Sequence, residues 1–281
     1  MKPLEEAKKQ FQNRQFERSI SILQPYLKIH PDSGEGWMGL GLSLICSGSA
    51  VEGIDALKKA QQCDPNNPKV YQASAMILRL FGRVKEAISY LQTAAIFAPV
   101  LLQPEIHLSL ATLQACLGDK EAIQLELQLL AKLQLIEPRK QLELYQEAQD
   151  FAGLKLFVER LSGDVKMLGA AVLLEETDQH RAEELYLSLC GNESELWEAY
   201  EYLARMYWEL KQDHIGQEFL RKAQTLAPQT AKVQLTSALY HVHKDPAAAK
   251  LQLQKLASYP GIFHSTRENA RQQLESLLDR Y

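Results

Sequence analysis

Apolar residues recur every three or four positions through most of the chain, and short polar or glycine-containing turns separate these segments. This spacing places the apolar side chains on one face of an α-helix. The segments show helical periodicity rather than the strict alternation that is typical of a β-strand. The pattern therefore predicts an all-α protein in which short amphipathic helices follow one another in pairs.

Three of these helix pairs end on a proline in the same register. The prolines are Pro31, Pro65 and Pro99, so the pattern repeats after 34 residues both times. Proline ends the second helix of each pair because its ring cannot continue a helix. Two equal spacings predict a tandem array of helix-turn-helix units.

The residues that recur in this register resemble the signature of the tetratricopeptide repeat (TPR) family. One unit carries Trp37, Leu40, Gly41, Leu44, Gly48, Leu57, Ala60 and Pro65, and the next carries Tyr71, Ser74, Ala75, Leu78, Gly82, Ala87, Leu91, Ala94 and Pro99. The one departure is Gly53, which stands where the later unit has Ala87. The resemblance implies a right-handed superhelical solenoid, in which a small residue such as Gly41 or Ala75 lets the two helices of a pair touch.

The repeat register weakens after Pro99 and later returns. We expect N-terminal TPR-like repeats over residues 1–138, degenerate helical repeats over 139–196, and TPR-like repeats with a capping helix over 197–281, in one continuous solenoid. The second helix of the fourth unit is expected to gain a turn through residues 124–138. Ser265-Thr266-Arg267-Glu268 reads as a capping box that opens the terminal helix, whose polar side chains suit the end of an array.

Composition and charge exclude several classes of protein. Hydrophobic residues make up 46% and charged residues 23% of the chain, which is the balance of a folded protein. The formal charge of −4 gives no basic surplus for a phosphate backbone, so we expect no nucleic-acid partner. Neither a secretory signal nor a membrane span is evident, and four dispersed cysteines fit reduced thiols. We therefore expect a cytoplasmic protein without direct membrane insertion.

The sequence offers weak candidates for catalysis or metal binding. Gly34-Glu35-Gly36 lacks the preceding strand and the GxxxxGK[ST] pattern of a phosphate-binding loop. His241 and His243 are two residues apart, so on a helix they point to nearly opposite sides. The adjacent acids Glu175-Glu176 and Glu183-Glu184 are typical of a solvated helix face. We expect no catalytic residue, no cofactor and no metal.

A second apolar stripe runs along the first helices of the pairs, opposite the signature residues. In TPR proteins ligands usually lie on this concave face, so the resemblance implies that the stripe binds a partner. Its candidate residues are Leu4, Phe11, Met38, Leu42, Ile45, Met76, Arg79, Leu80 and Leu108. A helix that is apolar on two faces is either covered by its neighbours or presents a groove, and the spacing leaves both alternatives open.

The resemblance also allows a test of the best-known TPR ligand mode, the dicarboxylate clamp that holds the acidic C-terminus of Hsp70 or Hsp90. The matching positions of this chain hold Leu4, Lys8, Gly39, Lys69 and Ala73, and only Lys69 fits the clamp. We therefore expect a protein or peptide partner with apolar anchors rather than a chaperone tail bound by a clamp of this kind.

Residues 175–209 are strongly acidic, unlike the apolar stripe of the N-terminal repeats. They hold ten acidic residues against Arg181 and Arg205, so this region is suited to steering a basic partner. Tyr202, Arg205 and Trp208 fall near the inner face of the clearest later repeat, and aromatic residues beside arginine are typical of binding hot spots. The alternative for Trp208 is that it fills the seam between two repeats.

These features predict a noncatalytic scaffold or adaptor that binds a peptide, a helix or a folded partner on its concave face. The alternative function is a regulatory or targeting subunit of an enzyme or of a secretion or assembly complex, in which another chain performs catalysis. An intrinsic enzyme needs a convergent polar pocket, and the sequence spacing does not provide one.

Overall fold

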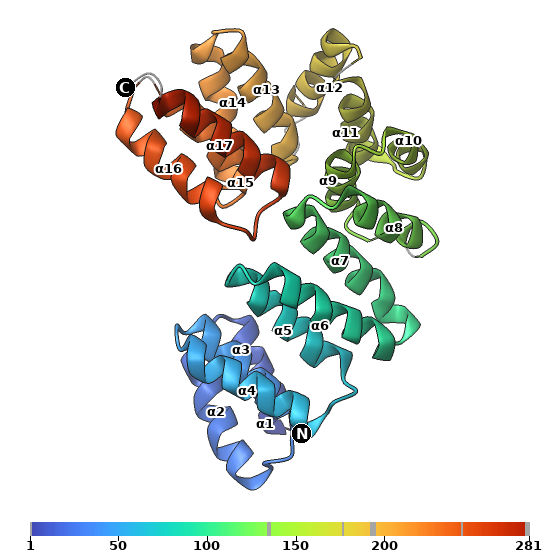
Figure 1. Ribbon diagram of the computed structural model, residues 1–281, viewed down its shortest axis with the longest axis vertical. Helices are drawn as coiled ribbons and strands as arrows, with labels where there is room; N and C mark the ends of the chain where they lie inside the picture. The colour runs from blue at the N-terminus through green and yellow to red at the C-terminus, as the bar shows by residue number, and fades with distance from the viewer. Residues whose placement is uncertain (1, 134–135, 176, 192–194, 243, 279–281) are drawn as a thin grey trace. The chain divides into compact units, whose positions relative to one another are not determined.

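The computed structural model describes residues 2–133, 136–175, 177–191, 195–242 and 244–278 (Figure 1). Within these ranges the chain forms seventeen α-helices and one short 3₁₀ helix, and it contains no β-strand. The prediction of an all-α fold is confirmed. The chain divides into two compact units, Met1–Leu113 (unit 1) and Gln114–Tyr281 (unit 2).

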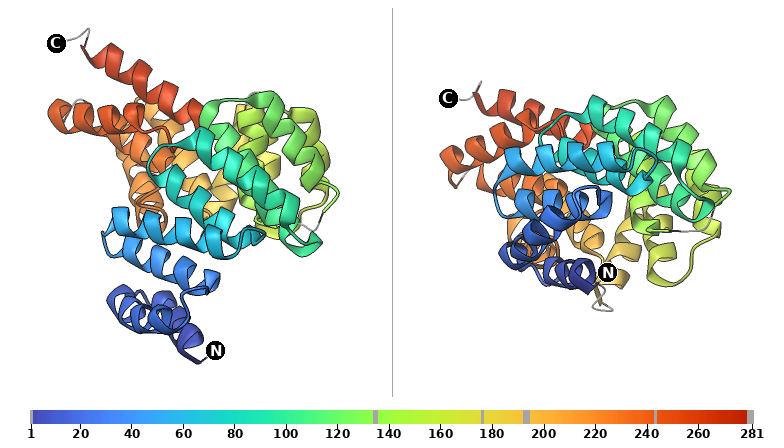
Figure 2. Two further views of the ribbon diagram at one scale, coloured as in Figure 1. Left: turned by 60° about the horizontal axis from the view of Figure 1, so that its bottom comes forward. Right: turned by 90° about the horizontal axis from the view of Figure 1, so that it is seen from below.

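Unit 1 consists of three helical hairpins and the start of a fourth helix pair. The hairpins lie beside one another in chain order, from blue to teal in Figure 2. Their helices are α1 (Lys2–Gln12), α2 (Phe16–Ile29), α3 (Gly34–Cys46), α4 (Ala50–Cys63), α5 (Pro68–Leu80) and α6 (Val84–Phe97), followed by the 3₁₀ helix η1 (Val100–Leu102) and α7 (Gln103–Leu117), which continues into unit 2.

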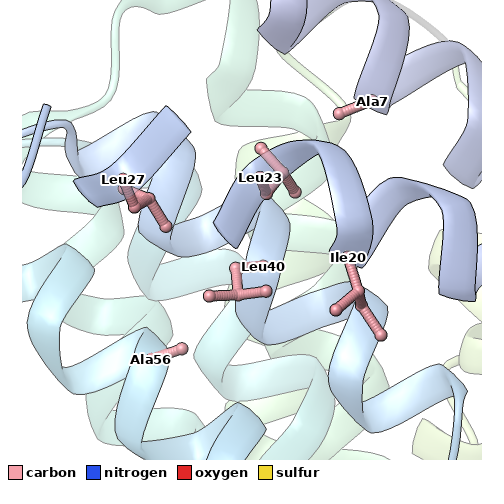
Figure 3. Packing of buried hydrophobic residues seen from close by; sticks show 6 residues of the cluster. All are labelled: Ala7, Ile20, Leu23, Leu27, Leu40 and Ala56. Carbon is pink, nitrogen blue, oxygen red and sulfur yellow. The ribbon is translucent and has the colours of Figure 1, made fainter. Parts of the chain in front are cut away.

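The apolar faces of the first two hairpins in unit 1 are buried against the hairpin that follows each of them. Figure 3 shows one such cluster, which joins helices α1 to α4 through Ala7, Ile20, Leu23, Leu27, Leu40 and Ala56. Full burial of a leucine side chain contributes about 2 kcal/mol, so an unstacked hairpin would lose much of its stability. This packing explains why the pattern must repeat along the chain.

The aromatic position of the signature ties each hairpin to the proline that closes the preceding one. The indole Nε1 of Trp37 donates a hydrogen bond to the carbonyl oxygen of Pro31 at 2.7 Å. One repeat later, the hydroxyl of Tyr71 donates to the carbonyl oxygen of Pro65 at 2.8 Å. The same contact therefore recurs with the 34-residue period of the sequence.

Small residues bring the two helices of a hairpin together, as predicted. A Cβ atom on Gly41 would lie 2.8 Å from the carbonyl oxygen of Gly53. A Cβ atom on Gly53 would in turn lie 2.8 Å from the carbonyl oxygen of Gly41 and 2.4 Å from Cγ1 of Ile45. The departure from the family pattern at Gly53 is thus explained by an unusually close approach of α3 and α4.

Unit 2 holds the remaining helices. They are α8 (Lys120–Leu130), α9 (Pro138–Ala148), α10 (Phe151–Glu159), α11 (Gly163–Leu174), α12 (Gln179–Gly191), α13 (Trp197–Glu209), α14 (Asp213–Leu226), α15 (Ala231–His241), α16 (Pro246–Ser258) and α17 (His264–Leu278). Helices α9 to α12 fall in the region where the sequence predicts degenerate helical repeats. The extra turn predicted for the second helix of the fourth unit is wrong, because α8 already ends at Leu130.

The start of the terminal helix also differs from the expectation. Helix α17 begins at His264, so Ser265 lies inside its first turn instead of capping it. The hydroxyl of Ser265 donates a hydrogen bond to Glu147 on α9, and Cys116 at the end of α7 contacts the carbonyl oxygen of Gly261 at 3.4 Å. These contacts join α17 and the loop before it to α9 and to the end of α7. The terminal helix is therefore packed on other helices of unit 2, whereas the sequence predicts a polar cap that faces water.

Candidate binding surfaces

The part of the apolar stripe on α3 is largely covered by neighbouring helices. Met38, Leu42 and Ile45 are partly buried, and they pack against a cluster that includes Ala73 and Ile77 of α5. For this helix the structure favours the alternative that the stripe serves packing between repeats.

The continuation of the stripe on α5 is open. Met76 is 50% exposed and Leu80 is 58% exposed, and they lie one helical turn apart on the same face. Arg79 stands between them in the sequence and is partly exposed. We call Met76 and Leu80 the α5 apolar pair; both side chains are exposed, whereas the stripe residues on α3 are partly buried.

The other predicted stripe residues of unit 1 lie in or against the core. Leu4 packs on the cluster of α1 to α4, and the ring of Phe11 lies 5.4 Å from that of Phe16 between their centroids. Leu108 is only 5% exposed. This corrects the expectation for Leu108, which offers no surface to a partner because its helix buries that face.

The predicted aromatic site of unit 2 is mostly internal. Tyr202 is buried and stacks on the ring of Tyr186, with 4.2 Å between the centroids. The guanidinium of Arg205 lies over Tyr202 at 5.3 Å from the ring centroid and remains partly exposed. Trp208 is partly buried against a cluster that includes Val233 and Tyr240 of the next repeat, so its contacts are those of a seam residue.

A polar recess lies on the inner side of unit 2, and the spacing of the sequence had not indicated it. Five helices line it, and the lining combines charged, aromatic and aliphatic side chains. We call this feature the inner recess; its lining residues are Arg139, Leu142, Glu143, Gln146, Leu168, Val172, Glu175, Tyr186, Trp197, Glu198, Glu201, Tyr202, Arg205 and Lys232.

Ion pairs occupy most of the charged groups around the inner recess. Arg139 donates two hydrogen bonds to Glu198, Nε to Oε1 at 2.8 Å and Nη2 to Oε2 at 2.6 Å. Glu201 is only 7% exposed and accepts a hydrogen bond from the hydroxyl of Thr236 at 2.6 Å. Arg205 lies 3.8 Å from Glu201, between Nε and Oε1. A buried carboxylate needs such partners because an unpaired charge is costly away from water.

Glu175 differs from the solvated acid that the sequence predicted. It follows the last residue of α11, is partly buried, and accepts a hydrogen bond from the hydroxyl of the fully buried Tyr186. Burial raises the pKa of Glu175 even though the hydrogen bond from Tyr186 and the positive charge of Arg205 act in the opposite direction. Its neighbour Glu176 lies outside the described residues.

Sequence reasoning missed the inner recess because its partners are far apart along the chain. Arg139 and Glu198 are separated by 59 residues, and Glu201 and Thr236 by 35. The one available signal was the excess of acids between residues 175 and 209, which indicated charge but not burial.

The other weak candidates have structural explanations or remain predictions. Gly34 and Gly36 lie in the first turn of α3, where Gly34 packs against Asp64 and the backbone amide of Gly36 is capped by Ser33. No group of three or more His, Cys, Asp or Glu side chains in the described part of the chain is arranged to hold a metal ion, and His243 lies outside it. None of the helices in the described ranges is long and apolar enough to cross a membrane.

Comparison with known proteins shows what this chain is similar to. Residues 4–68 match the model of the tetratricopeptide repeat. A peroxisomal targeting signal receptor from Candida glabrata is 33% identical over 84 residues, which cover 30% of this chain and 14% of the receptor.

Two solved structures share the fold. A tetratricopeptide repeat protein from Parabacteroides merdae has a TM-score of 0.61 at 17% identity, covering 87% of this chain and 98% of that one. A chain of the APC/C hetero-tetramer Cut9–Hcn1 has a TM-score of 0.53 at 20% identity, covering 92% of this chain and 45% of that one. Residues 4–68 thus match the tetratricopeptide repeat itself, and the 34-residue period and the paired helices make the described chain similar in fold to tetratricopeptide repeat proteins.

Proposed function

We propose that this chain is a noncatalytic adaptor that binds a protein partner through the α5 apolar pair. The observation that carries the proposal is the exposure of Met76 and Leu80, while the residues of the same stripe on α3 are packed. Two large apolar side chains one turn apart form a small continuous patch, which favours a partner more than scattered single residues do.

The partner expected at this patch is a protein segment with leucine-like or aromatic anchors, presented as an amphipathic helix or an extended strand. An acidic chaperone tail and a nucleic acid remain disfavoured by the residues and charge of the chain. A role as the regulatory or targeting subunit of a larger complex is the alternative. The receptor from Candida glabrata is named for a targeting signal, and Cut9–Hcn1 is a hetero-tetramer, so both relatives support an adaptor role of one kind or the other.

The chemistry of the inner recess supports a binding role over a catalytic one. Its described lining residues include no Ser, Cys or His that could act as a nucleophile beside a base. The carboxylates Glu198 and Glu201 are held by Arg139, Thr236 and Arg205. We expect the adaptor to act in the cytoplasm, without a cofactor or a metal.

The test is partner capture by chains altered at single exposed leucines. Leu80→Gln should weaken capture of each specific partner identified with the unmodified chain, and high salt should weaken it less, because apolar burial is screened little. Leu251→Gln is the matched control, since Leu251 is 70% exposed on α16 and lies outside the stripe. Equal capture by the Leu80 and Leu251 variants, with both folded, would show that the α5 apolar pair is not the binding surface.

A further inference from the structure

The inner recess of unit 2 contains a carboxylate, that of Glu175, with which no cation in the described ranges forms an ion pair. Arg139 is bound to Glu198, and Arg205 lies between Glu201 and Glu209, at 3.8 Å and 3.5 Å. Glu175 has only the hydroxyl of Tyr186 as a hydrogen-bond partner among the described residues.

The remaining cation of the inner recess is Lys232 on α15. It contributes to the electrostatic environment of Glu175, but no ion pair joins the two side chains in the described part of the chain. The recess therefore holds an acid whose charge is compensated only at a distance. Charge pairs in such a partly buried place are screened less than surface pairs, so an incoming cation would interact strongly with Glu175.

The free space of the inner recess is about 50 Å³, which suits the charged end of a lysine or arginine side chain. Leu142, Leu168 and Val172 line this space but are themselves buried, so the methylene stem of such a side chain would lie mostly outside the recess. An anionic ligand would instead meet the negative charges of Glu175 and Glu201. The acidic surplus of residues 175–209 would draw a basic segment toward this side of the unit.

We propose that the inner recess receives a positively charged side chain, of arginine or lysine, from a protein partner, with Glu175 as its counter-ion. This site lies in unit 2 and does not include Met76 or Leu80. It can therefore be tested, and can fail, independently of the adaptor surface on α5.

The experiment measures the binding of fluorescein-labelled pentapeptides to the full chain by fluorescence polarisation. The probes are Gly-Ser-Arg-Ser-Gly, its lysine counterpart, and a citrulline counterpart that keeps the shape of arginine without its charge. We expect at least one cationic probe to bind about tenfold more tightly than the citrulline probe, the effect of one charge-assisted hydrogen bond. Tighter binding of the arginine probe would identify a guanidinium site, and tighter binding of the lysine probe an ammonium site.

Three variants separate a specific counter-ion from general attraction. Glu175→Gln should abolish the preference for the cationic probe. Lys232→Gln should strengthen binding, because it removes the competing cation. Glu184→Gln changes the net charge as Glu175→Gln does, but the side chain of Glu184 is 66% exposed on α12, so binding should weaken far less than in Glu175→Gln.

Equal binding of the citrulline and cationic probes would overturn the proposal, and so would equal losses in the Glu175 and Glu184 variants. Circular dichroism checks the fold of each variant. If Glu175→Gln does not fold, the Lys232→Gln variant tests the proposal instead. Unchanged or weaker binding of the cationic probes by Lys232→Gln would contradict a counter-ion role for Glu175.

Discussion

The inner faces of the two units are built from the same kind of helix but carry opposite chemistry. On unit 1, the stripe on α3 and α5 consists of aliphatic residues such as Leu42, which is partly buried, and Leu80, which is exposed. On unit 2, α11 and α13 lead to Glu175, Glu201 and Arg205. The signature residues determine how the helices of a hairpin pack, and they leave the inner positions free to vary. Fold and binding chemistry are therefore specified by different positions of one repeat.

The two inner faces also satisfy different physical requirements. Partly covered aliphatic residues such as Leu42 need only close packing. A buried acid such as Glu201 needs hydrogen-bond donors, which Thr236 and Arg205 supply from defined directions. The apolar contacts of unit 1 thus place few directional requirements on their neighbours, whereas the polar recess of unit 2 is organised around specific charges.

The largest expected effect on stability tests the small signature residue that both units have in their hairpins. Ala75 in α5 and Ala204 in α13 hold the same signature position, and both are buried where two helices meet. Replacing either with leucine should destabilise the protein by about 1–3 kcal/mol, because the added bulk overpacks the contact. Urea unfolding measures the change. An effect at one site only would show that the hairpins of the two units are not packed alike.

The next prediction separates the covered and the open parts of the unit 1 stripe. Leu42→Gln should cost about 1–2 kcal/mol of unfolding free energy, since it places an amide against the cluster of Ala73 and Ile77. Leu80→Gln should change stability by less than about 0.5 kcal/mol, because Leu80 is exposed. Thermal or urea unfolding of the two variants measures whether Leu42→Gln loses more stability than Leu80→Gln. Equal losses would mean that Leu80 is a packing residue and not a binding one.

The fold was predictable because its determinants are local and periodic. The prolines, the aromatic position of Trp37 and Tyr71, and the small residue at Gly41 each act within one hairpin or between neighbours. The sequence-based prediction was wrong where a contact between residues far apart in the chain determines the role of a side chain. Ser265 looks like a helix cap in the sequence, but its hydroxyl bonds to Glu147, which is 118 residues away.

The candidate sites were predictable only in part. The stripe positions on α5 follow from helical spacing, but spacing does not reveal that α5 itself covers Leu42 of the preceding helix. The acidic surplus of residues 175–209 was visible, whereas the pairing of Glu198 with Arg139 depends on how three hairpins pack. Pairs of this kind have no fixed sequence spacing, so no periodicity indicates them.

A smaller effect is expected from the ion pair that borders the inner recess. Arg139→Gln should cost about 0.5–1 kcal/mol, because the side chain of Arg139 is about a third exposed and water screens its bond to Glu198. Lys58→Gln in unit 1 is the matched control, since Lys58 and Asp55 form an ion pair whose side chains are more exposed, at 64% and 62%. Urea unfolding at low and high salt measures both. A larger loss for Lys58→Gln would contradict the view that the polar contacts of unit 2 are the structural ones.

The smallest expected effect concerns how pH changes the free energy of unfolding. One acid in unit 2 and one in unit 1 should change it in opposite directions. Burial raises the pKa of Glu175 above its ordinary value of 4.5, so the folded chain binds this proton more readily than the unfolded chain does. Ionised Glu175 therefore opposes folding at neutral pH, and this penalty disappears as the pH falls below about 4.5. On unit 1, the hydrogen bond from Arg83 lowers the pKa of Glu86, so ionised Glu86 favours folding at neutral pH and loses that contribution in acid.

Replacing each acid with glutamine should consequently give opposite results at pH 7. Glu175→Gln should be more stable than the unmodified chain, with the difference vanishing near pH 4, because glutamine keeps an acceptor for Tyr186 without the buried charge. Glu86→Gln should be slightly less stable at pH 7, and only slightly, because its pair with Arg83 is exposed to solvent. Urea unfolding at pH 7 and pH 4 measures the two differences.

The sign of the change in Glu175→Gln separates two explanations. A loss of stability in Glu175→Gln at pH 7 would mean that the hydrogen bond from Tyr186 to the ionised carboxylate outweighs the cost of burying its charge. A gain would mean that unit 2 keeps an acid that costs stability, as expected of a residue retained for binding a cation.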